Sequence, residues 1–176
     1  MNNAAPVGPL EIQESERLAT LASLKWLDAP APAALEAVAR MAAQSLQCPV
    51  ACINLVDTHR LYALASHGLS QRHASRAGSW CERTIAQSDV LQQQGQAGDR
   101  WMFYAGAPIV VQGLALGTLC VMDATARQLT SEQTETLRDL AGVAQGLFEA
   151  RLEMRRIRKD AARVRTASMA GTDWLW

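Results

Sequence analysis

Two long apolar segments joined by a tight turn constrain the fold of this chain more than any other feature. They span Phe103–Val111 and Leu114–Met122, with Gln112-Gly113 between them. A two-residue connection of this kind between apolar strands predicts a β-hairpin. A second pair of strands is predicted at residues 50–56 and 61–66, around a short polar turn. The chain is therefore predicted to build an antiparallel sheet, which must be covered by other elements.

Helical periodicity is found at the two ends of the chain and in one short segment between the strands. The predicted helices span residues 10–27, 33–46, 80–87 and about 130–165. Ser79 with Glu82, and Thr130 with Gln133, have the pattern of a capping box at the start of the last two helices. Val90–Gln94 is a candidate edge strand. This order of elements predicts an α+β fold.

Composition limits this arrangement to one domain with extensions. The chain has 176 residues, of which 49% are hydrophobic, so a sizeable core can be buried. No apolar run reaches the length of about 18 residues that a membrane span needs, and residues 1–6 lack the pattern of a secretory signal. The four cysteines show neither a CxxC pair nor the Cys/His spacing of a metal site. We therefore expect a cytoplasmic protein with free thiols, no metal site and no membrane partner.

The end of the chain is strongly basic. Between Arg151 and Arg165 there are seven basic residues and two acidic ones. Such a segment can bind nucleic acid or acidic lipid, or it can form the solvated face of a helix. No aromatic side chains lie between these charges, as they would in a protein that stacks single-stranded bases. The solvated helix is the favoured interpretation, and nucleic acid is not an expected partner.

The last predicted helix also carries an interrupted apolar stripe. At 1.5 Å per residue, residues 130–165 would span roughly 50 Å, more than a domain of this size needs to cover its sheet. The stripe repeats in steps of three, four or seven residues, through Leu137, Leu140, Ala144, Leu147, Met154 and Ala161. Arg151 interrupts the stripe, and Ile157 lies one position early. This imperfect heptad pattern favours a parallel pair of helices, and hence a homodimer formed through the terminal helices.

Several segments together resemble bacterial GAF domains of the signalling type. They are Glu16-Arg-Leu-Ala-Thr-Leu21, Leu27-Asp28-Ala-Pro30, Ile53-Asn-Leu-Val-Asp57, Phe103-Tyr-Ala-Gly-Ala-Pro108, Leu116-Gly-Thr-Leu-Cys-Val-Met-Asp123 and Leu129-Thr-Ser-Glu-Gln133. The resemblance covers residues 14–152. It implies a central antiparallel sheet of five to six strands, with the N- and C-terminal helices packed on one face. The other face would carry a pocket roofed by the short helix. Domains of this family bind small molecules, bilins, haem or cyclic nucleotides, and many serve only as dimerisation or relay modules.

The segment beside the implied pocket departs from the family pattern. Relatives usually have Ser-Phe-Cys-Ala-His before the roof helix, whereas this chain has Ser79-Trp-Cys-Glu-Arg83. Between that helix and the hairpin only residues 88–101 remain, which indicates a shortened lid and a shallower, more open or collapsed pocket. The sequence has no Cys-His pair like that of bilin-binding relatives, and no recognisable cyclic-nucleotide signature. The resemblance therefore names no cofactor.

One enzyme shares the family's fold, the free methionine sulfoxide reductase, which uses a lid cysteine as nucleophile. Residues 88–101 contain no cysteine, and Cys81 occupies the place where those enzymes carry a non-essential one. We therefore expect no catalytic residues and no enzymatic activity. Cys81 has two interpretations: a small buried core residue, or a redox-sensitive thiol whose pKa would be lowered at a helix N-terminus.

Five residues are the candidates for a ligand-binding site, and they are Tyr62, Trp80, Cys81, Trp101 and Tyr104. Aromatic walls with a few polar groups are typical of small-molecule sites. The alternative is that Trp80 and Trp101 fill the space left by the shortened lid. Burying one such ring contributes on the order of 2–3 kcal/mol, so filling that space would be favourable.

Three functions are compatible with these patterns. The favoured one is a sensory or regulatory GAF domain of bacterial signal transduction, which dimerises and relays a signal through its long C-terminal helix. The second is a sensor that binds an unidentified small molecule under the roof helix, and the third is a redox enzyme of the sulfoxide reductase type.

The ends of the chain suggest how such a domain would be connected. Thr172-Asp173-Trp-Leu175 resembles the start of a GGDEF diguanylate cyclase domain, which implies an output partner of diguanylate cyclase or kinase type. The predicted organisation is a flexible N-terminus at 1–13, the GAF domain at 14–152, and a signalling helix with its tail at 153–176.

Overall fold

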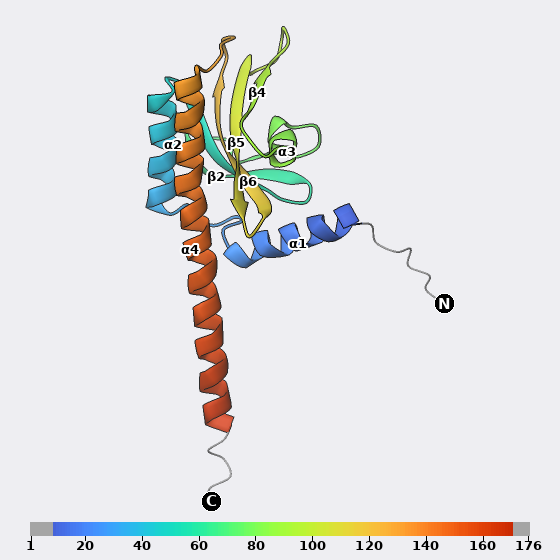
Figure 1. Cartoon of the computed structure of the whole chain (residues 1–176), viewed down its shortest axis with the longest axis vertical. Helices are drawn as coiled ribbons and strands as arrows, with labels where there is room; N and C mark the ends of the chain where they lie inside the picture. The colour runs from blue at the N-terminus through green and yellow to red at the C-terminus, as the bar shows by residue number, and fades with distance from the viewer. Residues whose placement is uncertain (1–8, 171–176) are drawn as a thin grey trace, which may run out of the picture.

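The centre of the protein is a six-stranded antiparallel sheet (Figure 1). The computed structural model describes residues 9–170. In the spatial order β3-β2-β1-β6-β5-β4, β1 and β6 form the middle, so the two predicted hairpins meet there. The strands span Val50–Val56 (β1), Arg60–His67 (β2), His73–Ser75 (β3), Leu91–Gln94 (β4), Phe103–Val111 (β5) and Leu114–Asp123 (β6). The predicted α+β fold with an antiparallel sheet is confirmed.

Four helices accompany the sheet in the described residues, and they span Pro9–Leu24 (α1), Ala33–Ser45 (α2), Trp80–Ile85 (α3) and Ser131–Ala170 (α4). Both predicted N-caps form, but only the cap of α4 makes the full capping box, because Glu82 Oε2 accepts from the Gly78 amide at 2.9 Å and the Ser79 amide donates to the Arg76 carbonyl. The Glu82 amide donates to Ser79 Oγ at 3.1 Å, and the Gln133 amide donates to Thr130 Oγ1 at 3.1 Å. The Thr130 amide in turn donates to Gln133 Oε1 at 3.0 Å. These bonds satisfy amides that have no partner inside the helix, and they fix where α3 and α4 begin.

Helices α2 and α4 lie side by side on one face of the sheet, here called the helix face (Figure 1). Leu35 of α2 and Phe148 of α4 are fully buried there against strand residues such as Ile53 and Ile109. Alternate residues of each strand point to the opposite face, here called the cavity face. Among the described residues, that face carries only the short helix α3 and the loops around it, so it has room for a pocket.

Helix α1 packs on the sheet differently from α2 and α4. Only its C-terminal end reaches the helix-face core, through Leu21 and Leu24, while the rest crosses the end of the sheet (Figure 1). The helix ends at Leu24 rather than at residue 27, because Lys25 adopts a left-handed φ of 55°. Trp26 then turns into the core, where its ring lies edge-on to Phe148 with centroids 5.0 Å apart.

One short strand is missing from the sequence prediction. Residues 69–78 are mostly polar and show no strand pattern in the sequence, yet His73–Ser75 forms β3 at the edge of the sheet. All three of its residues are exposed, so neither face carries the apolar alternation that identifies a strand. Backbone pairing with β2, such as Leu61 with Ala74, holds it in place. The strand brings the preceding loop over the cavity face.

The first part of α4 uses the predicted apolar stripe inside the domain. Leu137, Leu140 and Ala144 are buried in the helix-face core, so these three residues are not available to a second chain. Arg151, which interrupts the stripe, has an intramolecular role. It donates from Nε to the carbonyl of Leu24 at 3.0 Å, and its guanidinium lies 5.6 Å from the centre of the Trp26 ring.

The second part of α4 extends beyond the domain (Figure 1). The whole helix has 40 residues and is about 60 Å long. Side chains from residue 156 to residue 169 are all exposed. The helix runs through residues 152 and 153 without a break, so the proposed domain limit there stays a prediction. The segment 172–175 that resembles a diguanylate cyclase start lies outside the described residues.

Candidate functional site

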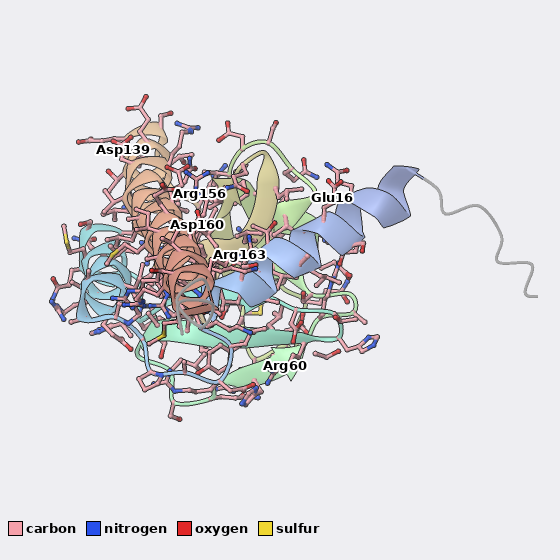
Figure 2. The ribbon with its side chains drawn as sticks, turned by 90° about the horizontal axis from the view of Figure 1, so that it is seen from below. Glu16, Arg60, Asp139, Arg156, Asp160 and Arg163 are labelled. Atoms are coloured by element: carbon pink, nitrogen blue, oxygen red, sulfur yellow. The ribbon has the colours of Figure 1, made fainter. Side chains whose placement is uncertain are left out.

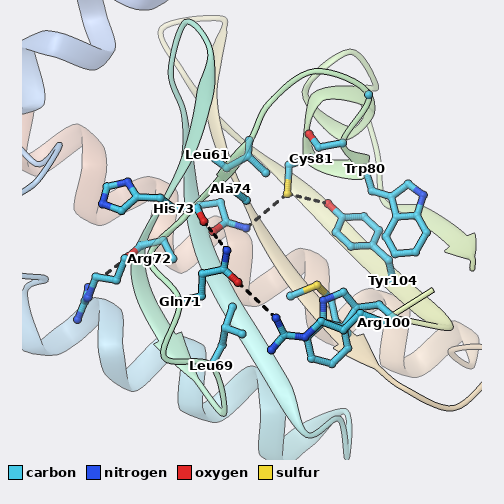
Figure 3. Close-up of a pocket in the computed structure, with 16 residues that line it drawn as sticks. Leu61, Leu69, Gln71, Arg72, His73, Ala74, Trp80, Cys81, Arg100 and Tyr104 are labelled. Carbon is cyan, nitrogen blue, oxygen red and sulfur yellow. Dashed lines mark hydrogen bonds between the residues drawn. The ribbon is translucent and has the colours of Figure 1, made fainter. Parts of the chain in front are cut away.

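A cavity of about 300 Å³ lies on the cavity face between the sheet and α3 (Figure 3). Its floor is formed by inward-pointing residues of three strands: Asn54, Leu61, Ala63 and Met122. The segment 69–74, between and within β2 and β3, forms one side. Figure 3 shows Trp80, Tyr104 and Arg100 on the opposite side, with Cys81 at the inner end.

Four of the five predicted site residues line this cavity: Trp80, Cys81, Trp101 and Tyr104. Tyr62 does not. Since neighbouring side chains of a strand point to opposite faces, Leu61 and Ala63 face the cavity while Tyr62 belongs to the helix-face core. Its hydroxyl donates to the Ala29 carbonyl at 2.9 Å. Tyr62 was selected from the sequence without considering which side chains of β2 would face the cavity.

Trp80 and Trp101 line the cavity and also fill part of the space beside it, so both of their predicted roles apply. Trp80 and Trp101 are half-buried and pack against the apolar cluster of the cavity face, yet a cavity remains between them and segment 69–74. Its volume lies at the lower end of the range found for small-molecule pockets. The shortened lid therefore leaves a small pocket that is neither filled nor flat.

Tyr104 is held rigidly in the wall of this pocket. Its ring lies over Gly106, where a Cβ atom would collide with the phenol group. Its hydroxyl is 2.8 Å from Thr84 Oγ1, and its ring centroid is 5.4 Å from that of Trp80. Burial, followed by the nearby thiols of Cys81 and Cys120, raises the pKa of Tyr104. The ring therefore presents a fixed, neutral aromatic surface.

Cys81 is surrounded by hydrogen-bond donors from the sheet. Asn54 Nδ2 and Thr118 Oγ1 each lie 3.4 Å from its sulfur, and Tyr104 Oη lies 3.6 Å away. Hydrogen bonding from the Cys120 thiol and then from Thr118, Tyr104 and Asn54 lowers the pKa of Cys81 to about 6, although burial acts in the opposite direction. The pKa of Cys81 is therefore lowered by hydrogen bonds, and not by a helix N-terminus as one of the two interpretations supposed. The side chain is also buried, with 4% of its surface exposed.

Sequence reasoning missed the polar residues that complete the site. Asn54 had a visible signal, because it is the one polar residue in the apolar run of β1. Gln71 and Arg100 had none, since both lie in polar loops. In the structure Arg100 Nη1 donates to Gln71 Oε1 at 3.3 Å, and the Arg100 guanidinium lies 4.9 Å from the centre of the Trp101 ring. These side chains meet at the open end of the cavity (Figure 3).

Two further features are absent from residues 9–170. No helix in this part of the chain is both long and apolar enough to cross a membrane. No group of three or more His, Cys, Asp or Glu side chains is arranged there to hold a metal ion.

One named protein is similar to this chain in sequence. A protein of Pseudomonas aeruginosa named cyclic di-GMP phosphodiesterase is 32% identical over 139 residues. The match covers 71% of this chain and 24% of that protein, so the chain spans about a quarter of the relative's length.

Solved structures agree on the fold. The GAF domain of a phosphoenolpyruvate-protein phosphotransferase from Coxiella burnetii gives a TM-score of 0.57 at 15% identity, covering 83% of this chain and 98% of that one. Free methionine-R-sulfoxide reductase from Neisseria meningitidis also gives 0.57, at 16% identity, covering 85% and 90%. Likeness at these identities concerns the fold alone. The family model of the GAF domain matches residues 31–145, more than half of the chain. The six-stranded sheet, the pocket under α3 and this match together show that the chain belongs to the GAF domain family.

Proposed function

We propose that this GAF domain is a cytoplasmic regulatory module of bacterial signal transduction, which forms a parallel homodimer through α4 and relays a signal along that helix. The observation that carries the proposal is an exposed apolar seam that continues past the domain. The seam consists of Val143, Leu147, Ala150, Met154, Ile157, Ala161 and Val164, all of them exposed except Leu147, which is half-buried against the helix-face core. Its members are separated by four and three residues in alternation, as in the a and d positions of a coiled coil.

The seam is unusual for its exposure. Met154, Ile157 and Val164 are 54%, 57% and 69% exposed, although large apolar side chains on one stripe gain free energy by leaving water. In the stripe read from the sequence, Ile157 lay one position early. It fits the heptad spacing when the stripe is begun at the exposed Val143 instead of at the buried residues. Among residues 9–170, no other element lies beside the free part of α4 to cover the seam (Figure 1).

Charges beside the seam favour a second copy of the same helix in parallel orientation. The positions before the last two a residues hold Glu153 and Asp160, and those after the last two d residues hold Arg158 and Arg165. In a parallel pair, Glu153 would face the partner's Arg158 and Asp160 would face the partner's Arg165. An antiparallel pair would place like charges together. Figure 2 shows Asp160 on the free part of α4, with Arg156 and Arg163 along the same helix.

The direction of the relay follows from the position of α4. The helix packs against α2 and β5 within the domain and then continues as one rigid element towards the C-terminus. A change at the domain would therefore alter how two such helices meet. The name of the Pseudomonas relative supports an output partner in cyclic di-GMP signalling, such as a diguanylate cyclase, with a kinase as the alternative. The domain itself would catalyse no reaction, since residues 88–101 provide no cysteine nucleophile.

Sedimentation equilibrium of the double variant Met154→Lys/Ile157→Lys tests the dimer. Both side chains are exposed, so the domain should stay folded while two buried charges disrupt the seam. We expect twice the chain mass of 19.1 kDa for the wild type and the single chain mass for the variant. Thr166→Lys places one lysine on the opposite side of the free helix and should remain dimeric. A monomeric wild type, or an unchanged double variant, would refute the proposed seam.

A second candidate function rests on the cavity. A pocket of about 300 Å³ with aromatic walls supports a sensor that binds a small molecule, whose occupancy would control the relay. Native mass spectrometry of the purified protein tests this directly. Additional mass of a small molecule on each chain would support the sensor, whereas bare chains across several growth conditions would count against it.

A further inference from the structure

We infer that the pocket of this GAF domain selects a small organic monoanion, with a flat apolar body inside the cavity and one carboxylate held by Arg100 at its open end. This inference rests on the sensor function proposed above and names its class of ligand. It follows from the charges around the cavity, from the contacts of Arg100 and from the chemistry of the inner end.

The charges that surround the cavity are of one sign. Its lining contains Arg72 and Arg100 and includes neither aspartate nor glutamate. Neither arginine forms an ion pair with any residue between 9 and 170. Other arginines of the fold do so, including Arg60 with Asp28 and Arg138 with Asp89. An uncompensated positive charge at the mouth of an apolar cavity favours an anion over a neutral or cationic ligand.

Arg100 is the arginine positioned to contact that anion. In Figure 3 it reaches across the open end towards Gln71, whereas the guanidinium of Arg72 is turned away from the cavity. Arg72 Nη1 donates instead to the carbonyl oxygens of Ala63 and Leu64, both at 3.2 Å. Arg100 lies against the Trp101 ring, and this contact restricts its orientation.

The acceptor that Arg100 now uses is a weak one. Its Nη1 donates to the neutral amide oxygen of Gln71 at 3.3 Å. A carboxylate offers a charged acceptor with two oxygens, which matches the fork of a guanidinium and forms shorter, stronger bonds. A ligand carboxylate would therefore replace Gln71 Oε1 as the partner of Arg100. The Gln71 amide nitrogen donates to the His73 carbonyl at 2.8 Å, which keeps the Gln71 side chain at the mouth.

The interior of the cavity suits an uncharged, flat body. Trp80, Trp101 and Tyr104 supply ring surfaces, while Leu61, Leu69 and Met122 supply aliphatic ones. The volume equals that of about ten water molecules, which corresponds to a ligand of roughly ten non-hydrogen atoms.

The inner end of the cavity excludes a second negative charge. Donors from Asn54, Thr118 and Tyr104 are directed at the sulfur of Cys81. A carboxylate at this end would therefore be buried with its best donors already engaged, beside a thiol whose lowered pKa adds negative charge. The ligand's single anionic group must then lie at the mouth.

Isothermal titration calorimetry with phenylacetate and phenylacetamide tests the charge requirement, because the two probes share one body and differ in charge. We expect the wild-type protein to bind phenylacetate about tenfold more tightly, as one hydrogen-bonded charge pair would give. Arg100→Gln should remove this preference and leave phenylacetamide affinity unchanged. Arg83→Gln neutralises an exposed arginine outside the cavity and should retain the preference. Arg100→Lys should retain part of it.

The outcomes separate the ligand class from the sensor function. If wild-type protein binds the two probes equally, or prefers phenethylamine, the anion class is wrong while a sensing pocket remains. If phenylacetate is preferred but Arg100→Gln keeps that preference, the assignment of Arg100 is wrong. If neither probe binds at millimolar concentration, the ligand class is overturned, and retained mass in native mass spectrometry still decides the sensor function independently.

Discussion

Arg17 shows how much of this fold depends on one residue that the sequence does not reveal. It lies among charged residues of the first helix, yet only 5% of its surface is exposed. Its Nη1 atom donates to the Val56 carbonyl at 2.6 Å, at the end of β1. Its Nε and Nη2 atoms donate to the two carboxylate oxygens of Glu14 at 2.7 and 2.9 Å. A helical periodicity that places Arg17 beside charged neighbours cannot show that a strand end lies against it.

The carboxylate of Glu14 is predicted to make the stability of the domain depend on pH. Hydrogen bonds from Arg17 first, and then from Arg76, lower the pKa of Glu14 from 4.5 to about 2. A group whose pKa is lower in the folded state stabilises the fold above its unfolded pKa, and this contribution is lost as pH falls through the folded pKa. The contribution of Glu14 should therefore be complete above about pH 5 and disappear between about pH 4.5 and 2. With the side chain 35% exposed, we expect about 1–2 kcal/mol after solvent screening.

Urea denaturation of Glu14→Gln at pH 7 and at pH 3 measures this contribution. The variant should lose about 1–2 kcal/mol at pH 7 and less at pH 3, because the wild type has then lost part of the same contribution. Glu16→Gln removes an exposed carboxylate two residues away and should change stability by less than about 0.5 kcal/mol. An equal loss for Glu14→Gln at both pH values would show that the charge of Glu14 is not responsible.

Gly106 is predicted to determine the shape of the pocket through Tyr104. A Cβ at this position collides with the phenol, which cannot move freely between Trp80 and Thr84. Gly106→Ala should therefore destabilise the domain by about 1–3 kcal/mol and change tryptophan fluorescence through Trp80. Gly142 lies on the exposed side of α4 with nothing near its Cβ direction, so Gly142→Ala should stabilise by up to about 1 kcal/mol. Equal effects of the two substitutions in a thermal unfolding experiment would contradict this account.

Among individual site residues, the sequence predicted those whose chemistry is conspicuous. Trp80, Trp101 and Tyr104 were identified because aromatic side chains are typical of the walls of small-molecule sites. Tyr62 was grouped with them on the same ground and lies on the opposite face. Tyr62 faces away from the cavity because of its position along β2. Since β2 is buried on both faces, its sequence does not alternate between apolar and polar residues, and it does not show which side chains share a face.

At the scale of elements, local signals predicted starts better than ends. Both N-cap bonds form where their residues occur, because an N-cap bond joins residues three positions apart. The end of α1 was predicted three residues late, because Lys25 leaves the helical conformation where Trp26 turns into the core. The exposed strand β3 was missed because its only support is backbone pairing with β2. Tertiary contacts determine these features, and a single sequence does not show them.

The cap of α4 is predicted to stabilise the domain measurably. Thr130→Ala removes the oxygen that accepts from the Gln133 amide, and it should lower the free energy of unfolding by about 1 kcal/mol in urea titrations. Thr136→Ala, one turn further along, removes a hydroxyl that only bonds back to the Glu132 carbonyl, so its effect should be smaller. If the two variants were equally stable, the capping box would contribute little to α4.

The molecule consists of a packed domain and a helix, α4, that extends beyond it. One apolar stripe was expected along the last helix, but the structure divides it. Its first part packs under the sheet, and a second set of residues shifted around the helix remains exposed. The sequence could not separate the two sets, since a residue that packs within the chain and one that awaits a partner are equally apolar. The sheet could be predicted from its long apolar strands, whereas the family and the general position of the pocket came from the resemblance of several short segments to GAF domains.

The arrangement of two α4 helices is the central claim, and site-specific crosslinking tests it most directly. Because all four native cysteines are buried, a cysteine introduced on α4 can be oxidised selectively. In a parallel, in-register dimer the two copies of residue 161 face each other across the seam, so Ala161→Cys should form an intermolecular disulfide rapidly and almost completely. Arg163→Cys, which lies away from the seam, should crosslink slowly. Equal rates for the two variants, or a protein that remains monomeric in both, would contradict the parallel dimer on which the proposed relay depends.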